Sequence, residues 1–99
     1  MTVIVTRDVP DRFRGFLASC ALEIAPGVYT APKMNVAVRE RLWAVLTDWH
    51  RALKQGAVVM TWDDPAHPAG QRVATLGFPP RELFEHDGIF LVRHERWTE

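Results

Sequence analysis

The sequence predicts an α+β fold in which two helices cover one face of an antiparallel sheet. Two segments carry apolar residues at helical spacing, and several β-branched segments are separated by turns rich in proline and glycine. The two helical segments also alternate with strands in the first part of the chain, as expected for a layer of helices packed on a sheet. With 99 residues, the chain has room for one domain (residues 1–99) and one core.

The first strand is predicted over residues 2–8 because this run is rich in β-branched side chains. Pro10 ends the strand and suits the first turn of a helix. The apolar residues that follow recur at the spacing of one helical face: Phe13, Phe16, Leu17, Cys20, Ala21 and Ile24. The helix is expected to stop at Pro26-Gly27, and residues 28–30 form a short strand.

A second helix is predicted after Asn35, which is a suitable N-cap residue. Its apolar positions again share one face: Val38, Leu42, Val45, Leu46, Trp49 and Leu53. Gly56 fits the C-terminal cap of this helix.

Three further strands complete the predicted chain. Residues 57–62 and 71–76 form a hairpin around the polar turn 63–70, where Asp63-Asp64 suits a turn better than a metal site. The last strand covers residues 89–94. The order β-α-β-α-β-β-β favours a ferredoxin-like sandwich with extra C-terminal strands.

The sheet leaves one face without helices, and its central strands are expected to be apolar on both faces. Val3, Val5, Val58 and Met60 alternate there with Ile4, Val59 and Thr61. An apolar second face needs a cover. The sequence therefore predicts a homodimer.

Charge and cysteine content narrow the class of protein. Twelve basic and twelve acidic residues cancel, which argues against a strongly basic nucleic-acid binder but leaves room for a local basic patch. Cys20 is the only cysteine, so there is no disulfide framework and no cysteine zinc site, as is usual in a reducing cytoplasm. Its place on the predicted buried face of the first helix indicates an inert thiol.

Asp8 is the strongest candidate for chemistry. It stands at the end of the first strand, where a carboxylate can hold a hard cation such as Mg²⁺, and two copies across a dimer axis would make a better site than one. A magnesium ion held there could activate a water for phosphodiester hydrolysis. The alternative is that Asp8 and Asp11 only favour the positive N-terminus of the following helix.

Arg7, Arg12 and Arg14 place three guanidinium groups in eight residues. Such a group of arginines can grip a phosphate backbone. The alternative is an ordinary solvated helix face.

Several stretches together resemble the CRISPR-associated protein 2 family, in its type I-E subtype. They are residues 3–15, 23–29, 38–43, 57–62, 75–77 and 87–92. The resemblance implies a ferredoxin-like homodimer that acts in spacer acquisition during antiviral defence. In that role the dimer is a scaffold that bridges dimers of the integrase, CRISPR-associated protein 1, and holds duplex protospacer DNA. Members of the wider family are also described as Mg²⁺-dependent endonucleases that act on RNA or duplex DNA.

The same resemblance implies roles for particular residues. Asp8 matches the acid of the wider family that serves as metal ligand and catalytic residue from both protomers, although Arg7 stands where type I-E relatives often carry an acid. Arg12, Arg14 and Arg81 match DNA-backbone contacts, and residues 89–94 match the segment that docks the integrase. Apart from the family, a regulatory domain that binds a metabolite between protomers stays open as a third interpretation.

Overall fold

The computed structural model describes residues 1–77, 82–86 and 89–93 of the chain. Its elements in chain order are β1 (Thr2–Arg7), α1 (Asp11–Ala18), β2 (Leu22–Ala25), β3 (Val28–Ala31), α2 (Val36–Leu53), β4 (Ala57–Asp63), β5 (Gln71–Leu76), β6 (Glu82–His86) and β7 (Ile89–Arg93).

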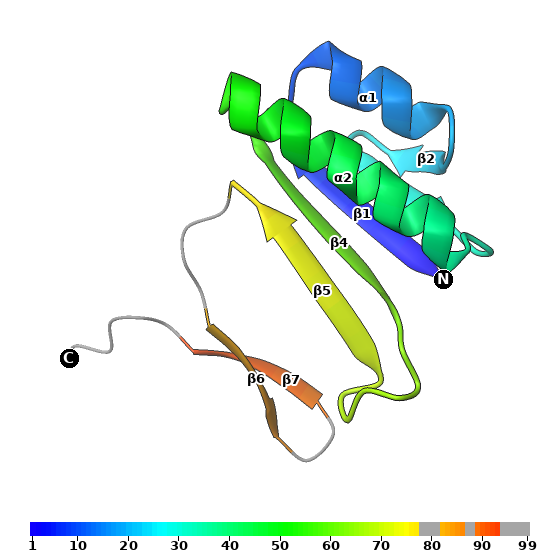
Figure 1. Ribbon diagram of the computed structural model, residues 1–99, viewed down its shortest axis with the longest axis vertical. Helices are drawn as coiled ribbons and strands as arrows, with labels where there is room; N and C mark the ends of the chain where they lie inside the picture. Colours follow the sequence, from blue (N-terminus) through cyan, green and yellow to red (C-terminus); the bar gives the residue numbers. More distant parts are fainter. Residues whose placement is uncertain (78–81, 87–88, 94–99) are drawn as a thin grey trace.

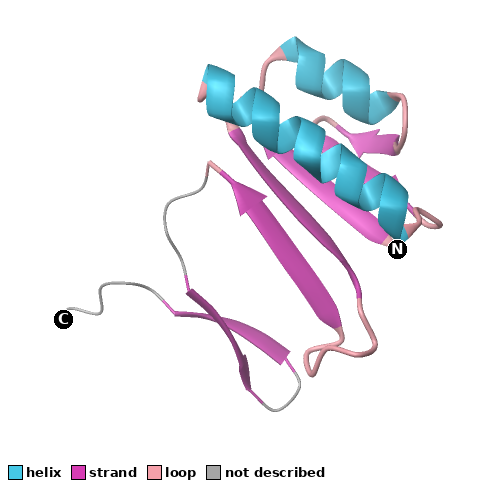
Figure 2. Cartoon of the chain, in the orientation of Figure 1, coloured by secondary structure: helices cyan, strands magenta, loops and turns pink. Residues whose placement is uncertain are grey.

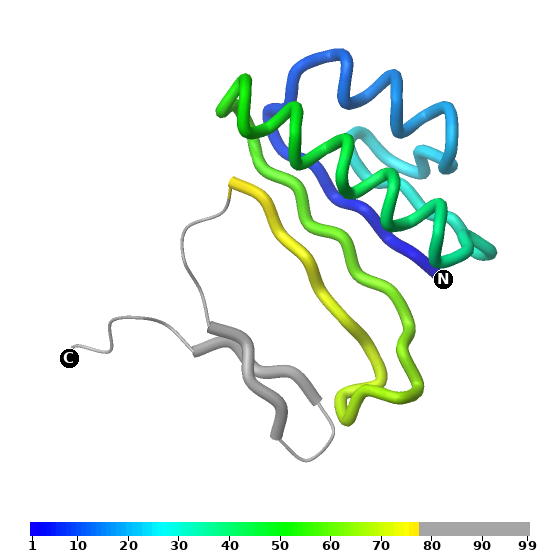
Figure 3. Tube along the Cα trace, in the orientation of Figure 1, coloured from blue at the N-terminus to red at the C-terminus, as the bar shows by residue number. Residues whose placement is uncertain are grey.

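The main sheet has five strands in the order β2-β3-β1-β4-β5, and every neighbouring pair is antiparallel. The first strand therefore lies at the centre, as the traces in Figure 1 and Figure 3 show. The strands β6 and β7 pair with each other in a second, two-stranded sheet. This arrangement, with a helix after β1 and after β3, confirms the predicted ferredoxin-like α+β sandwich.

Both helices pack on the same face of the sheet (Figure 2). The buried cluster between the layers draws two residues from each helix and four from the sheet: Phe13 and Leu17, Leu42 and Leu46, and Ile4, Tyr29, Val58 and Met60. Trp49 of α2 packs against this cluster, edge to face with Phe13 and Phe16. The amphipathic spacing seen in the sequence therefore marks the core face in the middle of each helix. At the two ends of the face predicted for α2, Val38 and Leu53 are exposed.

The prediction that the first helix runs on to Ile24 is wrong. The helix ends at Ala18, where the amide of Ser19 bonds to Phe16 and the amide of Cys20 to Leu17, both as tight turns. Residues 22–25 instead form β2, which pairs with β3 around the Pro26-Gly27 turn. A strand at this edge gives β3 a partner on its outer side, which a longer helix would leave without backbone hydrogen bonds.

Cys20 is consequently not on the buried face of a helix. It lies after the end of α1 and is exposed. Its Sγ atom lies 3.4 Å from the carbonyl oxygen of Phe16, within the range of a weak S–H hydrogen bond. Partial burial raises the pKa of this thiol above its ordinary value, and the hydrogen bond with Ser19 lowers it to a smaller extent.

The second helix begins as predicted, with the side chain of Asn35 accepting a hydrogen bond of 2.8 Å from the amide of Val38. It ends differently. Lys54, with φ 51°, supplies the left-handed cap, and its amide bonds to His50. Gly56 follows two residues later and starts the turn into β4.

Within the described residues, the second face of the sheet carries no helix (Figure 2). Strand alternation and register place a set of mostly β-branched residues there: Val3 and Val5, Val28 and Thr30, Val59 and Thr61, Val73 and Thr75, with Leu22 at the β2 edge. Leu22 is 67% exposed. We refer to this set as the open face.

The C-terminal part holds one strand that the sequence did not predict, β6. The last predicted strand, residues 89–94, is confirmed over Ile89–Arg93, while residue 94 lies outside the described residues. None of the helices described, α1 and α2, is long and apolar enough to cross a membrane.

Candidate nucleic-acid interface

Asp8 directly follows β1 and is exposed. Its φ is 55°, a left-handed conformation that aspartate tolerates better than most residues. Its backbone carbonyl accepts a hydrogen bond of 3.2 Å from the side-chain amide of Gln55. Asp8 therefore presents its carboxylate to solvent from a fixed turn at the end of the central strand.

Two glycines make that turn narrow. A Cβ on Gly56 would lie 2.6 Å from the carbonyl oxygen of Asp8, and Gly56 has φ 82°. The backbone of Gly77, at the end of β5, packs in turn against the Gly56 carbonyl, which also lies 3.1 Å from the Nε2 atom of His50. This end of the sheet is held by close backbone contact that only glycine allows.

The surroundings of Asp8 in one protomer do not make a metal site. Among the described residues, no three His, Cys, Asp or Glu side chains come together. A single exposed carboxylate does not give Mg²⁺ the several oxygen ligands it takes from protein and substrate. One protomer thus offers one ligand, and a metal site of the predicted kind needs Asp8 from a second copy.

Arg12 and Arg14 are both exposed on α1, but the fold separates them. Arg12 faces α2, and its guanidinium carbon lies 5.2 Å from the centre of the Trp49 ring. Arg14 lies on the other side of the helix, beside β2, where it lines a shallow cleft with residues 23–26. The side chains of Arg12 and Arg14 therefore project from opposite sides of α1.

Arg7 is the last residue of β1 and is exposed. Its register partner is Ala57, and strand alternation places it on the open face with Val3 and Val5. Arg7 is therefore directed to a different face of the molecule from Arg12. Arg81, the other predicted DNA contact, lies outside the described residues.

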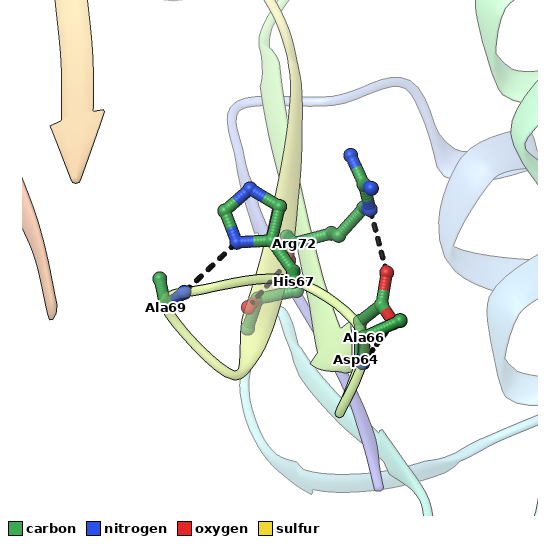
Figure 4. A network of polar contacts seen from close by, with 6 residues as sticks. Asp64, Ala66, His67, Ala69 and Arg72 are labelled. Atoms are coloured by element: carbon green, nitrogen blue, oxygen red, sulfur yellow. Dashed lines mark hydrogen bonds and ion pairs between the residues drawn. The ribbon is translucent and has the colours of Figure 1, made fainter. Parts of the chain in front are cut away.

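The β4–β5 turn contains a network of polar contacts (Figure 4). Asp64 accepts a hydrogen bond of 2.6 Å from Nε of Arg72 and another from the amide of Ala66. The bond from Arg72 lowers the pKa of Asp64. His67 accepts from the amide of Ala69 through its Nδ1 atom. Asp64 has the turn role that the sequence favoured.

A larger cleft of about 610 Å³ lies between the end of α1, the β2–β3 hairpin and the start of α2. Its walls are largely apolar and include Cys20, Leu22, Met34 and Val38. None of the predicted site residues lines it.

The sequence did not predict a functional role for Glu23 or Tyr29. Both side chains lie on the helix side of the hairpin, as paired residues of β2 and β3. The Oε2 atom of Glu23 accepts a hydrogen bond of 2.9 Å from the amide of Gly27. The signal that could have found this pair is the hairpin itself, since Pro-Gly flanked by apolar residues is a common two-residue turn.

Comparison with protein-family models identifies the family of this chain. Residues 1–91 match the family model described as CRISPR-associated protein (Cas_Cas2CT1978). The chain belongs to the Cas2 family. The match extends from β1 into β7, so the central strand with Asp8 and the helix with Arg12 and Arg14 are both part of the Cas2 domain.

Proposed function

We propose that this Cas2 protein is a scaffold of CRISPR adaptation, in the type I-E manner: a homodimer that bridges integrase dimers and binds duplex protospacer DNA. The observation that carries the proposal is the exposure of Arg12 and Arg14 on the helix that follows the central strand. Guanidinium groups at such positions bind phosphate oxygens, and binding to phosphates alone is independent of sequence, as a protein that captures foreign DNA requires.

The open face supports the homodimer. Its paired rows, such as Val28, Val5 and Val59, are apolar and only partly buried in the single chain. Covering these side chains with a second copy removes apolar surface from water at about 25 cal/mol per Å². A dimer also doubles the number of arginines available to one duplex, while its net charge stays at zero.

The second candidate function, a Mg²⁺-dependent endonuclease, depends on Asp8. The observation in its favour is that Asp8 is exposed at the end of the central strand, where two copies could share an ion. The scaffold is preferred because it needs no carboxylate pair and because Arg7 adds a positive charge beside Asp8.

The test is duplex binding by purified protein, with and without the integrase, over a range of salt concentrations. Replacing Arg12 and Arg14 together with alanine is expected to weaken binding and to reduce the salt slope by about 0.9 for each phosphate that is no longer neutralised. The matched control replaces Arg41 and Arg51, two exposed arginines of α2. Equal weakening in the two double variants would contradict the proposal, because it would reflect net charge alone. Light scattering of the mixture with integrase tests the bridging role.

A further inference from the structure

Tyr29 of β3 has a fully buried side chain with an unusual hydroxyl. The residue is 0% exposed, and its hydroxyl has no hydrogen-bond partner among the described residues. A buried hydroxyl without a hydrogen bond is destabilising, so such groups are generally satisfied or serve a purpose. Tyr29 is also the only tyrosine in the chain.

Two charged side chains from neighbouring elements act on this hydroxyl. Glu23 is the register partner of Tyr29 on β2, and Arg14 comes from α1. Burial raises the pKa of Tyr29, and Glu23 raises it further through its negative charge and as an acceptor beside the hydroxyl. Arg14 lowers it, as a donor beside the hydroxyl and through its positive charge. The hydroxyl therefore lies within the electrostatic reach of both groups.

The same two side chains line the shallow cleft beside β2. The cleft has a volume of about 300 Å³, and its other lining residues are Ile24, Ala25 and Pro26. Glu23 is fixed there by the amide of Gly27, with which it makes a hydrogen bond of 2.9 Å. Glu23 is thus an anchored acceptor and Arg14 an exposed donor at the rim. Between them, the buried Tyr29 hydroxyl makes no well-formed hydrogen bond within the described residues.

We propose that Tyr29 and Glu23 are positioning residues for Arg14, whose guanidinium closes over the cleft to meet a phosphodiester group of duplex DNA. In this arrangement the Tyr29 hydroxyl donates to Glu23 and accepts one N–H from Arg14. The guanidinium carries five N–H donors, so the others stay free to bind two phosphate oxygens. The inference rests on the proposed function, because it names what holds one of its DNA contacts.

The contrast with Arg12 makes the inference specific. Arg12 is held by the face of Trp49 and has no part in the cleft. A role for Tyr29 in DNA binding must therefore depend on Arg14 and not on Arg12.

The first experiment titrates Tyr29 in the DNA-free protein, using its single ring signal in the NMR spectrum of protein with labelled tyrosine. Arg14→Ala is expected to raise the pKa of Tyr29, because it removes a positive charge that favours the tyrosinate. Glu23→Gln is expected to lower it, because it removes a negative charge that disfavours the tyrosinate. Arg12→Ala is the control and should leave the pKa of Tyr29 unchanged. Circular dichroism over the same pH range checks that the protein stays folded.

An unchanged pKa of Tyr29 in both Arg14→Ala and Glu23→Gln overturns the inference.

The second experiment is a double-mutant cycle on duplex affinity. Tyr29→Phe is expected to weaken binding by about three- to tenfold, the range of one hydrogen bond. It should have no further effect in the Arg14→Ala background, and its full effect should persist in the Arg12→Ala background. Removing a hydroxyl without a partner should leave thermal stability unchanged or raise it, so a structural defect is distinguishable. An equal effect in both backgrounds overturns the positioning role.

The failures of this inference and of the proposed function differ. Absence of the titration shifts, with DNA binding still dependent on Arg14, overturns the inference alone. DNA binding independent of both Arg12 and Arg14 overturns the proposed function, and with it the positioning role of Tyr29.

Discussion

The guanidinium carbon of Arg12 lies 5.2 Å from the centroid of the Trp49 ring, so that a residue of α1 is stacked on α2 at the surface. The same indole packs edge to face on Phe13, whose side chain is fully buried. Trp49 therefore contacts both the buried core and an exposed cation. The arginine is ordered by this contact while its edges stay accessible to a ligand.

From this contact we expect Arg12→Ala to lower the free energy of unfolding by less than about 1 kcal/mol, the usual range of an exposed cation–π pair. Trp49→Ala removes the ring contacts with Phe13 and Phe16 as well and should cost about 3 kcal/mol. Urea denaturation followed by circular dichroism measures both. A large destabilisation in Arg12→Ala would mean that its effect on DNA binding cannot be separated from folding.

Asp8 allows the scaffold and the nuclease to be separated, provided that the substitution respects its backbone. Asp8→Asn keeps a residue type that tolerates φ 55°, whereas Asp8→Ala adds a conformational cost of about 1 kcal/mol. If the protein is a scaffold, Asp8→Asn retains spacer acquisition in cells that supply the integrase. If it is a nuclease, the variant loses Mg²⁺-dependent cleavage. Abolished acquisition by a dimer that still binds integrase would contradict the scaffold.

Gly77 and Gly70 form a matched pair of left-handed glycines. Both have φ above 70°, but a Cβ at Gly77 would meet the Gly56 carbonyl and the His50 ring, whereas one at Gly70 would meet nothing within 4 Å. Gly70→Ala is expected to cost about 1 kcal/mol from backbone conformation alone. Gly77→Ala should cost clearly more, because the end of the sheet must also move. Similar midpoints of urea denaturation for the two variants would show that this end is loosely packed.

The open face can be tested at Val59, which pairs with Val5 on one side and Thr75 on the other. Val59→Asp would place a carboxylate in the proposed dimer interface and should weaken dimerisation at least tenfold, since burying an unpaired charge is costly. Sedimentation analysis gives the dissociation constant. Val36→Asp, at a site on α2 that is 55% exposed, is the control. Val5→Lys serves as the second interface variant if Val59→Asp does not fold, and an unchanged dimer in a folded variant would exclude this interface.

Cys20 offers a prediction on pH dependence. Its thiol is exposed, yet partial burial raises its pKa above the ordinary value, so the reactive thiolate is scarce at neutral pH. Alkylation by iodoacetamide should therefore be slower than that of a free cysteine and should accelerate only under alkaline conditions. Mass spectrometry over time measures the rate. Alkylation as fast as that of a model thiol at neutral pH would contradict the shift.

The fold was largely predictable because long amphipathic patterns dominate it. The spacing of Leu42, Leu46 and Trp49 identified α2 and its core face. Asn35 marked the start of α2, where its side chain accepts a hydrogen bond from the amide of Val38. The β2 strand was not predicted, because Ala21 and Ile24 continue the helical spacing of apolar residues in α1 by coincidence. Pairing with β3 decides between helix and strand there, and such pairing is not a local property of the sequence.

The candidate site was predictable in residue types but not in arrangement. Arg12 and Arg14 are two residues apart, which on a helix directs them to nearly opposite sides, one toward Trp49 and one toward Glu23. The buried Tyr29 hydroxyl emerged only from packing, since nothing in the sequence marks a hydrogen bond that is missing.

The position of β1 at the centre of the sheet has a consequence for folding. Both partners of this strand lie well after it in the chain, and Thr2 pairs with Trp62. Contacts between residues so distant in sequence slow folding, because a long loop must close before any of them forms. The β1 strand must therefore wait for β4 with one of its edges unpaired. Folding of this chain is expected to be limited by the docking of β4, after the helices and the β2–β3 hairpin have formed.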